Sequence, residues 1–513
     1  MELDRRDLQY LSALAQYNSE RRTEIRRYLE SALSTKNEIA SIEGIRDSAE
    51  ELGDTSLDEF EGEFLRRILL LTPEDVAPQD HQLYLLARYA EVEEELEEAG
   101  GFPPSLVLSF ETLLHDEIML NRAEAFDVLN RIEKPEDYQK HSDPRHIVEP
   151  PADFIDKWAA CITFQKHEIF SEFISQVVPL DKPEMITNAQ SNVELIFSFL
   201  SYPDLEERNS EYQFLLTPLF PINDDEFIVL FPQTLLTTAH YRLEEYLSKN
   251  DDAQRVENQT KGKSVEELTF DTLSQIPSQN FVKELHYIHD PHERESDGLL
   301  IFEDSYWVVE IKSHPLFRKV PSNIDMVRSR YLNKVESASE QGAKFLDFLE
   351  SSISDYQLLY NLTGKKSVDD MENGTIVVLD GFLPTFYSDN ERTDRQTGFG
   401  SIYEFDLRSE RLFVISLYEL FQLIQQPEVD QFEDFLMWRT GYDGNHPIRG
   451  FNEREYWAFY FDNYRNNSEM QEGLELAVEK DIVTLYISER FNSKDHLKNL
   501  QIEGDFGNGF MNS

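Results

Sequence analysis

Residues 295–313, ESDGLLIFEDSYWVVEIKS, constrain the fold more than any other stretch of the chain. Two apolar runs, GLLIF and YWVVEIKS, are separated by residues 303–305, which is the pattern of two strands joined in a hairpin. Glu310 and Lys312 are two residues apart, so on a strand they share one face. Opposite charges in a strand that looks buried are costly unless they are paired or hold a metal.

The segments around this hairpin alternate between helical and strand patterns. The segment SVEELTFDTLSQI is expected to form an amphipathic helix, and FVKELHYI after it is a strand candidate. A long helix is expected over DMVRSRYLNKVESASEQGAKFLDFLESSI, followed by strands over GTIVVLDGFL and RLFVISL. Residues 255–420 are therefore expected to form one domain in the order helix, three strands, helix and strand.

The flanking regions are expected to be helical. Residues 1–254 carry apolar residues at three- and four-residue spacing, as in HQLYLLARYAEVEEELEEA, which predicts a mainly α-helical region. Residues 421–513 return to helices rich in aromatic side chains, as in YWAFYFDNYRNN. Together with the middle part, these patterns predict an α+β protein of several domains, and a chain of 513 residues is too long for one core.

The formal net charge of −51 is the strongest global signal, with 99 acidic against 48 basic residues. Such a surface keeps a protein soluble at high salt, where self-repulsion is screened. We therefore expect a halophilic protein, adapted to a salty cytoplasm; a solvated acidic surface that says nothing about partners is the alternative. The charge argues against non-specific nucleic-acid binding by the bulk surface, but not against a local site.

No pattern in the sequence predicts a membrane or secreted protein. No apolar run is long enough to span a bilayer, and the first ten residues lack the apolar core of a signal peptide. The single cysteine, Cys161, excludes an intramolecular disulfide and a zinc site built from cysteines. We therefore expect a cytoplasmic protein without membrane contact.

The hairpin can bring three charged groups into one site. Asp297 on the first strand can lie beside Glu310 on the second, and two converging carboxylates suit Mg²⁺ or Mn²⁺. Lys312 reaches the same site, where an ammonium can orient a water or stabilise charge on a phosphate. These groups meet the needs of phosphodiester hydrolysis. The alternative for Glu310 and Lys312 alone is an ordinary charge pair on an edge strand.

Asp297, followed on the next strand by Glu310 and Lys312, resembles the PD-(D/E)xK nuclease motif. The ordered helix, hairpin and helix are similar to the restriction-endonuclease-like and nuclease-related-domain branches of that superfamily. The resemblance covers roughly residues 255–420. It implies an αβββαβ core, a Mg²⁺ or Mn²⁺ ion held by Asp297 and Glu310, and hydrolysis of nucleic acid, with DNA favoured. Ser296 stands where the motif has proline.

The same resemblance implies two further site residues. Those branches carry a glutamate on the first helix, which Glu266 matches in KGKSVEE, with Glu267 as the fallback. They also carry a glutamine on the second helix that contacts the lysine or a phosphate, and Gln341 in SEQGAKFL matches it. Taken alone, Glu266 fits a solvated helix residue equally well.

Basic residues cluster after the second strand of the hairpin. Between residues 313 and 334, one acidic residue, Asp325, stands against five basic ones, which are Arg318, Lys319, Arg328, Arg330 and Lys334. In so acidic a chain this cluster fits contact with a phosphate backbone and ion pairing with neighbouring acidic helices equally well.

Two functions from different classes remain open. The first is a metal-dependent nuclease, with defence or repair as roles taken from family association. The second is a non-catalytic nucleic-acid-binding or scaffold protein that keeps a nuclease-like fold. The presence of Asp297, Glu310 and Lys312 favours the first, because a degraded site would tend to lose one of them. The N-terminal helical region leaves a protein partner or a homo-oligomer open.

Overall fold

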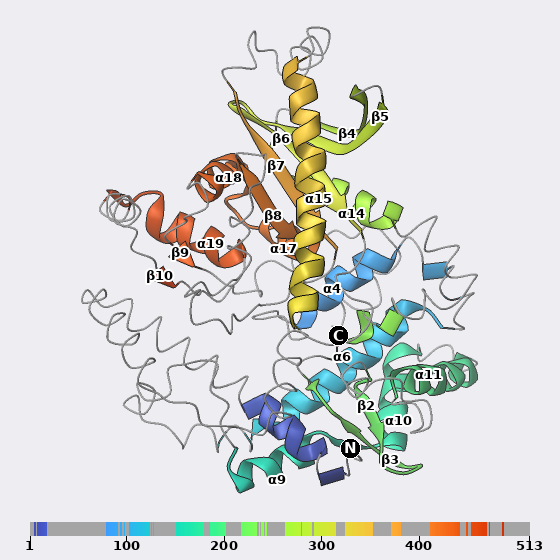
Figure 1. The fold of residues 1–513 in the computed structure, drawn as a ribbon. Helices are drawn as coiled ribbons and strands as arrows, with labels where there is room; N and C mark the ends of the chain where they lie inside the picture. The colour runs from blue at the N-terminus through green and yellow to red at the C-terminus, as the bar shows by residue number, and fades with distance from the viewer. Residues whose placement is uncertain are drawn as a thin grey trace.

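The computed structural model describes most of the chain between residues 5 and 468. The described ranges are 5–17, 78–90, 102–123, 150–178, 185–201, 217–232, 262–289, 292–313, 324–351, 371–380, 411–441 and 453–468, apart from Asp7 and Gln279, together with some shorter pieces. They form a mixed α/β structure around a five-stranded sheet (Figure 1).

The five-stranded sheet has the strand order β4-β5-β6-β7-β8. Its strands are β4 (Asn280–His289), β5 (His292–Ile301), β6 (Ser305–Lys312), β7 (Glu372–Leu379) and β8 (Leu412–Ser416). The first three are antiparallel neighbours, and β7 and β8 continue in parallel with β6. Helix α14 (Gly262–Ser274) precedes β4, and helix α15 (Ile324–Ser351) connects β6 to β7. The helices and strands thus follow the expected order.

Strand β6 is buried on both faces, which explains its almost continuous apolar sequence. Tyr306 and Val308 pack with Phe345 of α15 in a small cluster. Trp307 and Val309 point the other way and belong to the larger core. A charged residue in this strand is therefore surrounded by apolar side chains unless it lies near an end.

The C-terminal region packs directly onto the sheet. It contains α17 (Leu417–Leu423), η8 (Val429–Gln431), α18 (Phe432–Thr440), β9 (Ile448–Arg449), α19 (Glu453–Phe459), a π-helical turn η9 (Tyr460–Tyr464) and β10 (Leu485–Tyr486). Ser416, the last residue of β8, and Glu419 form a capping box at the N-terminus of α17, so the helix begins directly after the strand. Glu433 of α18 accepts the Ser305 hydroxyl at 2.6 Å. Ser305 was expected in the hairpin turn, but it is the first residue of β6.

The N-terminal region is mainly helical, but it also contains a small sheet that the sequence did not predict. Its helices are α4 (Pro78–Tyr89), α6 (Pro104–Asn121), α9 (Ala152–Cys161), α10 (Lys166–Val177) and α11 (Ile186–Leu200). The antiparallel sheet has the order β1-β3-β2, with β1 (Thr163–Gln165), β2 (Leu219–Pro221) and β3 (Glu226–Val229). Strands of three or four residues are too short to show a period of two.

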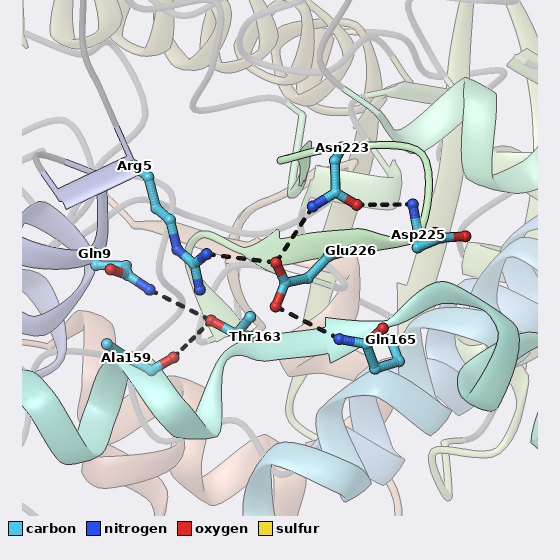
Figure 2. A network of polar contacts seen from close by, with 8 residues as sticks. All are labelled: Arg5, Gln9, Ala159, Thr163, Gln165, Asn223, Asp225 and Glu226. Atoms are coloured by element: carbon cyan, nitrogen blue, oxygen red, sulfur yellow. Dashed lines mark hydrogen bonds and ion pairs between the residues drawn. The ribbon is translucent and has the colours of Figure 1, made fainter.

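A polar network joins the first helical segment to this small sheet (Figure 2). Arg5 Nη1 lies 3.4 Å from Oε2 of Glu226 on β3, and Gln9 donates to the Thr163 hydroxyl at 3.4 Å. Gln165 of β1 donates to the other oxygen of Glu226 at 3.5 Å. Exposed pairs of this kind contribute roughly 0–1 kcal/mol. The network therefore orients the segment more than it stabilises it.

One cluster of buried apolar residues runs through all three regions. It includes Leu8 and Phe110 from the N-terminal region, Val309 from the sheet and Leu436 from the C-terminal region. The regions therefore pack against one another. Among the described helices, none is both long and apolar enough to cross a membrane.

Candidate active site

Asp297 lies where β5 separates from β6. The ladder between the two strands ends at the pair Gly298–Val309. Beyond it, the backbone N–H of Ile311 donates to Oδ2 of Asp297 at 2.6 Å, so a side chain takes the place of the neighbouring strand. This bond directs the Asp297 carboxylate to the end of β6 that carries the other charged residues.

Glu310 and Lys312 share one face of β6, as their spacing predicts. Lys312 Nζ lies 3.9 Å from Oε2 of Glu310, and the two side chains are 20% and 3% exposed. The Ser296 hydroxyl donates to Oε1 of Glu310 at 3.3 Å. Burial and the nearby Asp297 carboxylate raise the pKa of Glu310 to about 8, against the lowering effects of Lys312 and Ser296. The negative charge at this position is therefore costly without a further cation.

Helix α15 brings Gln341 to the lysine. Lys312 Nζ donates a hydrogen bond to Oε1 of Gln341. The next residue, Gly342, allows α15 to lie close to β7, because a Cβ at this position would stand 2.6 Å from the Thr375 side chain. The glycine lets α15 pack close to the sheet, and this places Gln341 beside Lys312.

Glu266, on α14, faces the same group of carboxylates. Burial and then the charge of Asp297 are the largest causes that raise the pKa of Glu266 to about 7. The pKa of Asp297 is also raised, mainly by burial, while its hydrogen bond from Ile311 and the charge of Lys312 oppose the shift. The structure therefore brings all five predicted residues into one neighbourhood.

The fallback residue Glu267 is directed elsewhere. Its Oε2 lies 3.9 Å from Nζ of Lys283, a cation that also lies 3.9 Å from Asp271. Glu267 is therefore paired with a lysine outside the carboxylate group, whereas the charge of Asp297 acts on Glu266.

Glu284 adds a further charge to this group of carboxylates, although nothing in the sequence predicts it. Its charge adds to the raised pKa of Glu266, after burial and the charges of Asp297 and Glu295. It lies opposite Asp297, at a gap between two paired positions of the β4–β5 ladder. Its φ of 54° is left-handed, the one such angle among the described non-glycine residues. Glutamate carries no signal for this conformation, so the sequence could not identify it.

The oxygen donors at this site suit a divalent cation that completes its shell elsewhere. In the described part of the chain, no group of three or more His, Cys, Asp or Glu side chains has the geometry of a metal site. Mg²⁺, however, is commonly held by one or two carboxylates, with waters and substrate phosphates as the other ligands. Asp297 and Glu310 supply two such carboxylates. Burial is the largest cause that raises the pKa of each, so their ionised forms are disfavoured and a cation between them would stabilise the ionised forms. The pair therefore fits Mg²⁺ or Mn²⁺.

The basic cluster expected to contact phosphate lies largely outside the described structure. Arg318 and Lys319 are outside the described residues, and so are the side chains of Arg328 and Arg330. Lys334 lies on α15 and is partly buried. The phosphate-binding role of this cluster stays a prediction.

No protein-family model, curated protein or solved structure matches this chain. The residues of the candidate site and their geometry therefore carry the functional information.

Proposed function

We propose that the chain is a metal-dependent nuclease of the PD-(D/E)xK type that hydrolyses phosphodiester bonds of nucleic acid, with DNA favoured. The observation that carries the proposal is the convergence of Asp297, Glu310 and Lys312 at the carboxyl end of β6. The order α14, β4, β5, β6, α15 and β7 supports an αβββαβ core. Glu266 and Gln341 come to the same group from the two helices.

Each residue has a distinct role in this proposal. Asp297 and Glu310 would hold the metal ion, while Ile311 and Ser296 each donate a hydrogen bond to one oxygen of these carboxylates. A bound Mg²⁺ supplies a Lewis acid and lowers the pKa of a water molecule. Lys312 places a positive charge beside these carboxylates, where it stabilises the charge that develops on the phosphate.

Gln341 and Glu266 act on the surroundings of the reacting atoms. Gln341 accepts a hydrogen bond from Lys312, so the direction of the ammonium is set before the substrate binds. Glu266 has a pKa of about 7, so near neutral pH it can both accept and release a proton.

The test is nicking of supercoiled plasmid with Mg²⁺ or Mn²⁺, at low and at molar salt. Lys312→Met removes the ammonium and keeps the length of the side chain. We expect cleavage to fall about a hundredfold or more, which is about 3 kcal/mol, as for loss of a preorganised electrostatic donor. The matched control is Lys344→Met on α15, where the lysine pairs with Glu340 at 3.5 Å; it should change the rate less than about twofold.

Asp297→Asn separates metal binding from charge stabilisation. It should weaken Mn²⁺ binding, measured by the paramagnetic signal of the free ion, and it should also lower the rate of cleavage. Lys312→Met should leave Mn²⁺ binding largely intact, because the oxygens remain. Cleavage by Lys312→Met at the wild-type rate would make the lysine a structural partner of Glu310 and overturn the proposal. A wild-type protein that binds DNA or RNA but never cuts it would be the non-catalytic alternative.

A further inference from the structure

Arg88, near the end of α4, forms a buried two-bond ion pair with Asp380, the residue after β7. Arg88 Nε lies 3.1 Å from Oδ1 and Nη2 lies 3.2 Å from Oδ2. The side chains are 1% and 0% exposed. Tyr84, one turn earlier on α4, donates its hydroxyl to Oδ1 at 3.4 Å. Two parallel bonds fix the angle between the groups as well as their distance.

Asp380 is also bonded to the strand that carries the candidate catalytic lysine. Its backbone N–H donates to the carbonyl oxygen of Lys312 at 3.1 Å. The residue before it, Leu379, pairs with Lys312 in the parallel β6–β7 ladder. The main chain of Lys312 is therefore joined to Asp380, and the side chain of Asp380 is joined to α4.

Helix α4 also contacts the other side of the candidate site. It packs against α14, which carries Glu266, and against α17, which follows β8. Figure 1 shows α4 lying between the end of the five-stranded sheet and the rest of the N-terminal region. One helix of that region therefore meets α14, which supplies Glu266, and Asp380, which is bonded to the carbonyl oxygen of Lys312.

We propose that Arg88 and Asp380 are positioning residues, through which the N-terminal region sets the orientation of Lys312. This inference rests on the proposed nuclease function. A buried ion pair is often no more stabilising than apolar side chains of the same volume, so stability alone does not account for it. The geometry of the pair instead explains how the carbonyl oxygen of Lys312 is held in place, through the backbone N–H of Asp380. A partner that moves α4 would thereby change the position of the Lys312 ammonium.

The test replaces the pair by neutral side chains and compares it with a matched pair elsewhere. Arg88→Met/Asp380→Asn removes both charges together and leaves no unpaired buried ion. The control is Arg439→Met/Glu453→Gln, because this pair has the same two-bond form, at 2.9 Å for each bond, and is almost as buried. It lies on α18 and α19, in the C-terminal region.

Two measurements decide the outcome. Amide hydrogen exchange at Asp380 reports its bond to Lys312 and needs no catalysis. We expect exchange there to become about tenfold faster or more in the Arg88→Met/Asp380→Asn variant and to stay unchanged in the control. In steady-state cleavage, kcat should fall about tenfold while KM changes less than about twofold, since the change acts on the transition state. Arg88→Lys keeps the charge and should recover part of kcat.

Three results would overturn the inference. An unchanged exchange rate of the backbone amide at position 380 in the double variant would show that the pair does not hold the Lys312 carbonyl. An equal loss of kcat in the control would assign the effect to general stability. A wild-type kcat despite faster exchange would show that the bond to the Lys312 carbonyl does not affect catalysis.

Two further measurements cover the cases in which this test cannot be run. If the wild-type protein does not cut nucleic acid, the nuclease proposal fails, and the reductive methylation rate of Lys312 replaces kcat as the measurement. An unchanged methylation rate in the double variant would then overturn the positioning role. If the double variant does not fold, Tyr84→Phe tests the same bond, with a smaller increase in exchange expected and no increase counting against it.

Discussion

Gly342 of α15 and Thr375 of β7 are in such close contact that a Cβ on the glycine would stand 2.6 Å from both Oγ1 and Cγ2 of the threonine. Gln341 precedes this glycine and accepts a hydrogen bond from Lys312. The contact therefore sets how near α15 lies to the sheet, at the position where the helix meets the candidate active site.

Gly342→Ala should be destabilising, although alanine is the better helix former. Helix propensity favours alanine by about 1 kcal/mol, but overpacking against Thr375 costs about 1–3 kcal/mol. We expect the free energy of unfolding in urea to fall and cleavage to fall with it, because Gln341 moves away from Lys312. Adding Thr375→Ala removes the two nearest atoms and should restore both values. A gain in stability from Gly342→Ala alone would mean that α15 moves freely at this position.

Glu310 should make the protein less stable as the pH rises in the absence of divalent cations. Burial, with the charge of Asp297, raises the pKa of Glu310 from 4.5 to about 8. Between these values the unfolded chain has lost the proton that the folded chain keeps, so the free energy of unfolding falls with increasing pH. Above about pH 8 both states are ionised and this contribution becomes constant.

The measurement is urea unfolding in EDTA at several values between about pH 5 and about pH 8. Glu310→Gln cannot ionise and should show a shallower decline than the wild type. Glu340→Gln is the control, since Glu340 is 57% exposed on α15. Equal slopes for the wild type and Glu310→Gln would show that Glu310 is already ionised in the folded protein.

Ser296 should lower the pKa of Glu310 through its hydrogen bond to that carboxylate. The serine is 0% exposed and donates to Oε1 of Glu310 at 3.3 Å, and this bond lowers the pKa of the glutamate. Ser296→Ala should therefore raise that pKa, shift the pH–rate profile of cleavage to higher pH, and cost about 1 kcal/mol of stability. The control is Ser339→Ala, because the buried Ser339 hydroxyl has no hydrogen-bond partner within the described structure. It should be neutral or stabilising, and an unchanged profile for Ser296→Ala would contradict the role.

Local patterns predicted the strands of the five-stranded sheet and the helices α14 and α15, because each of these elements carries its own signal. β6 shows an apolar run and α15 shows a long amphipathic period, and the two-residue spacing of Glu310 and Lys312 placed both on one face. The carboxylate of Asp297 was expected near them because a hairpin can place a residue of its first strand beside one of its second strand. These inferences need only neighbouring residues.

Other features depend on contacts that no local pattern records. The pair Arg88–Asp380 joins residues 292 positions apart, and neither side chain is unusual in its own segment. The left-handed φ of Glu284 stands at a gap in the β4–β5 ladder, and the bond from Ile311 to Asp297 forms beyond the last pair of the β5–β6 ladder. The strands β1 to β3 are too short for a pattern. The sequence therefore predicted Asp297, Glu310, Lys312 and Glu266, but neither Glu284 nor the contacts that hold these groups.

The acidic surface should make stability depend strongly on salt. The net charge is −51, and like charges act even at the candidate site, where Glu295 and Glu284 add to the raised pKa of Glu266. The distance over which charges act falls from about 10 Å at 0.1 M salt to about 3 Å at 1 M. Repulsion between surface carboxylates is therefore strong in dilute buffer and largely screened at molar salt.

We expect the thermal midpoint of unfolding to rise with the concentration of KCl, steeply at first and then less as screening saturates. A neutral osmolyte at the same concentration separates screening from exclusion of solutes from the surface, because exclusion acts without any charge and does not saturate in this range. A midpoint that is flat or falls between dilute buffer and about 1 M KCl would remove salt adaptation as the explanation of the charge.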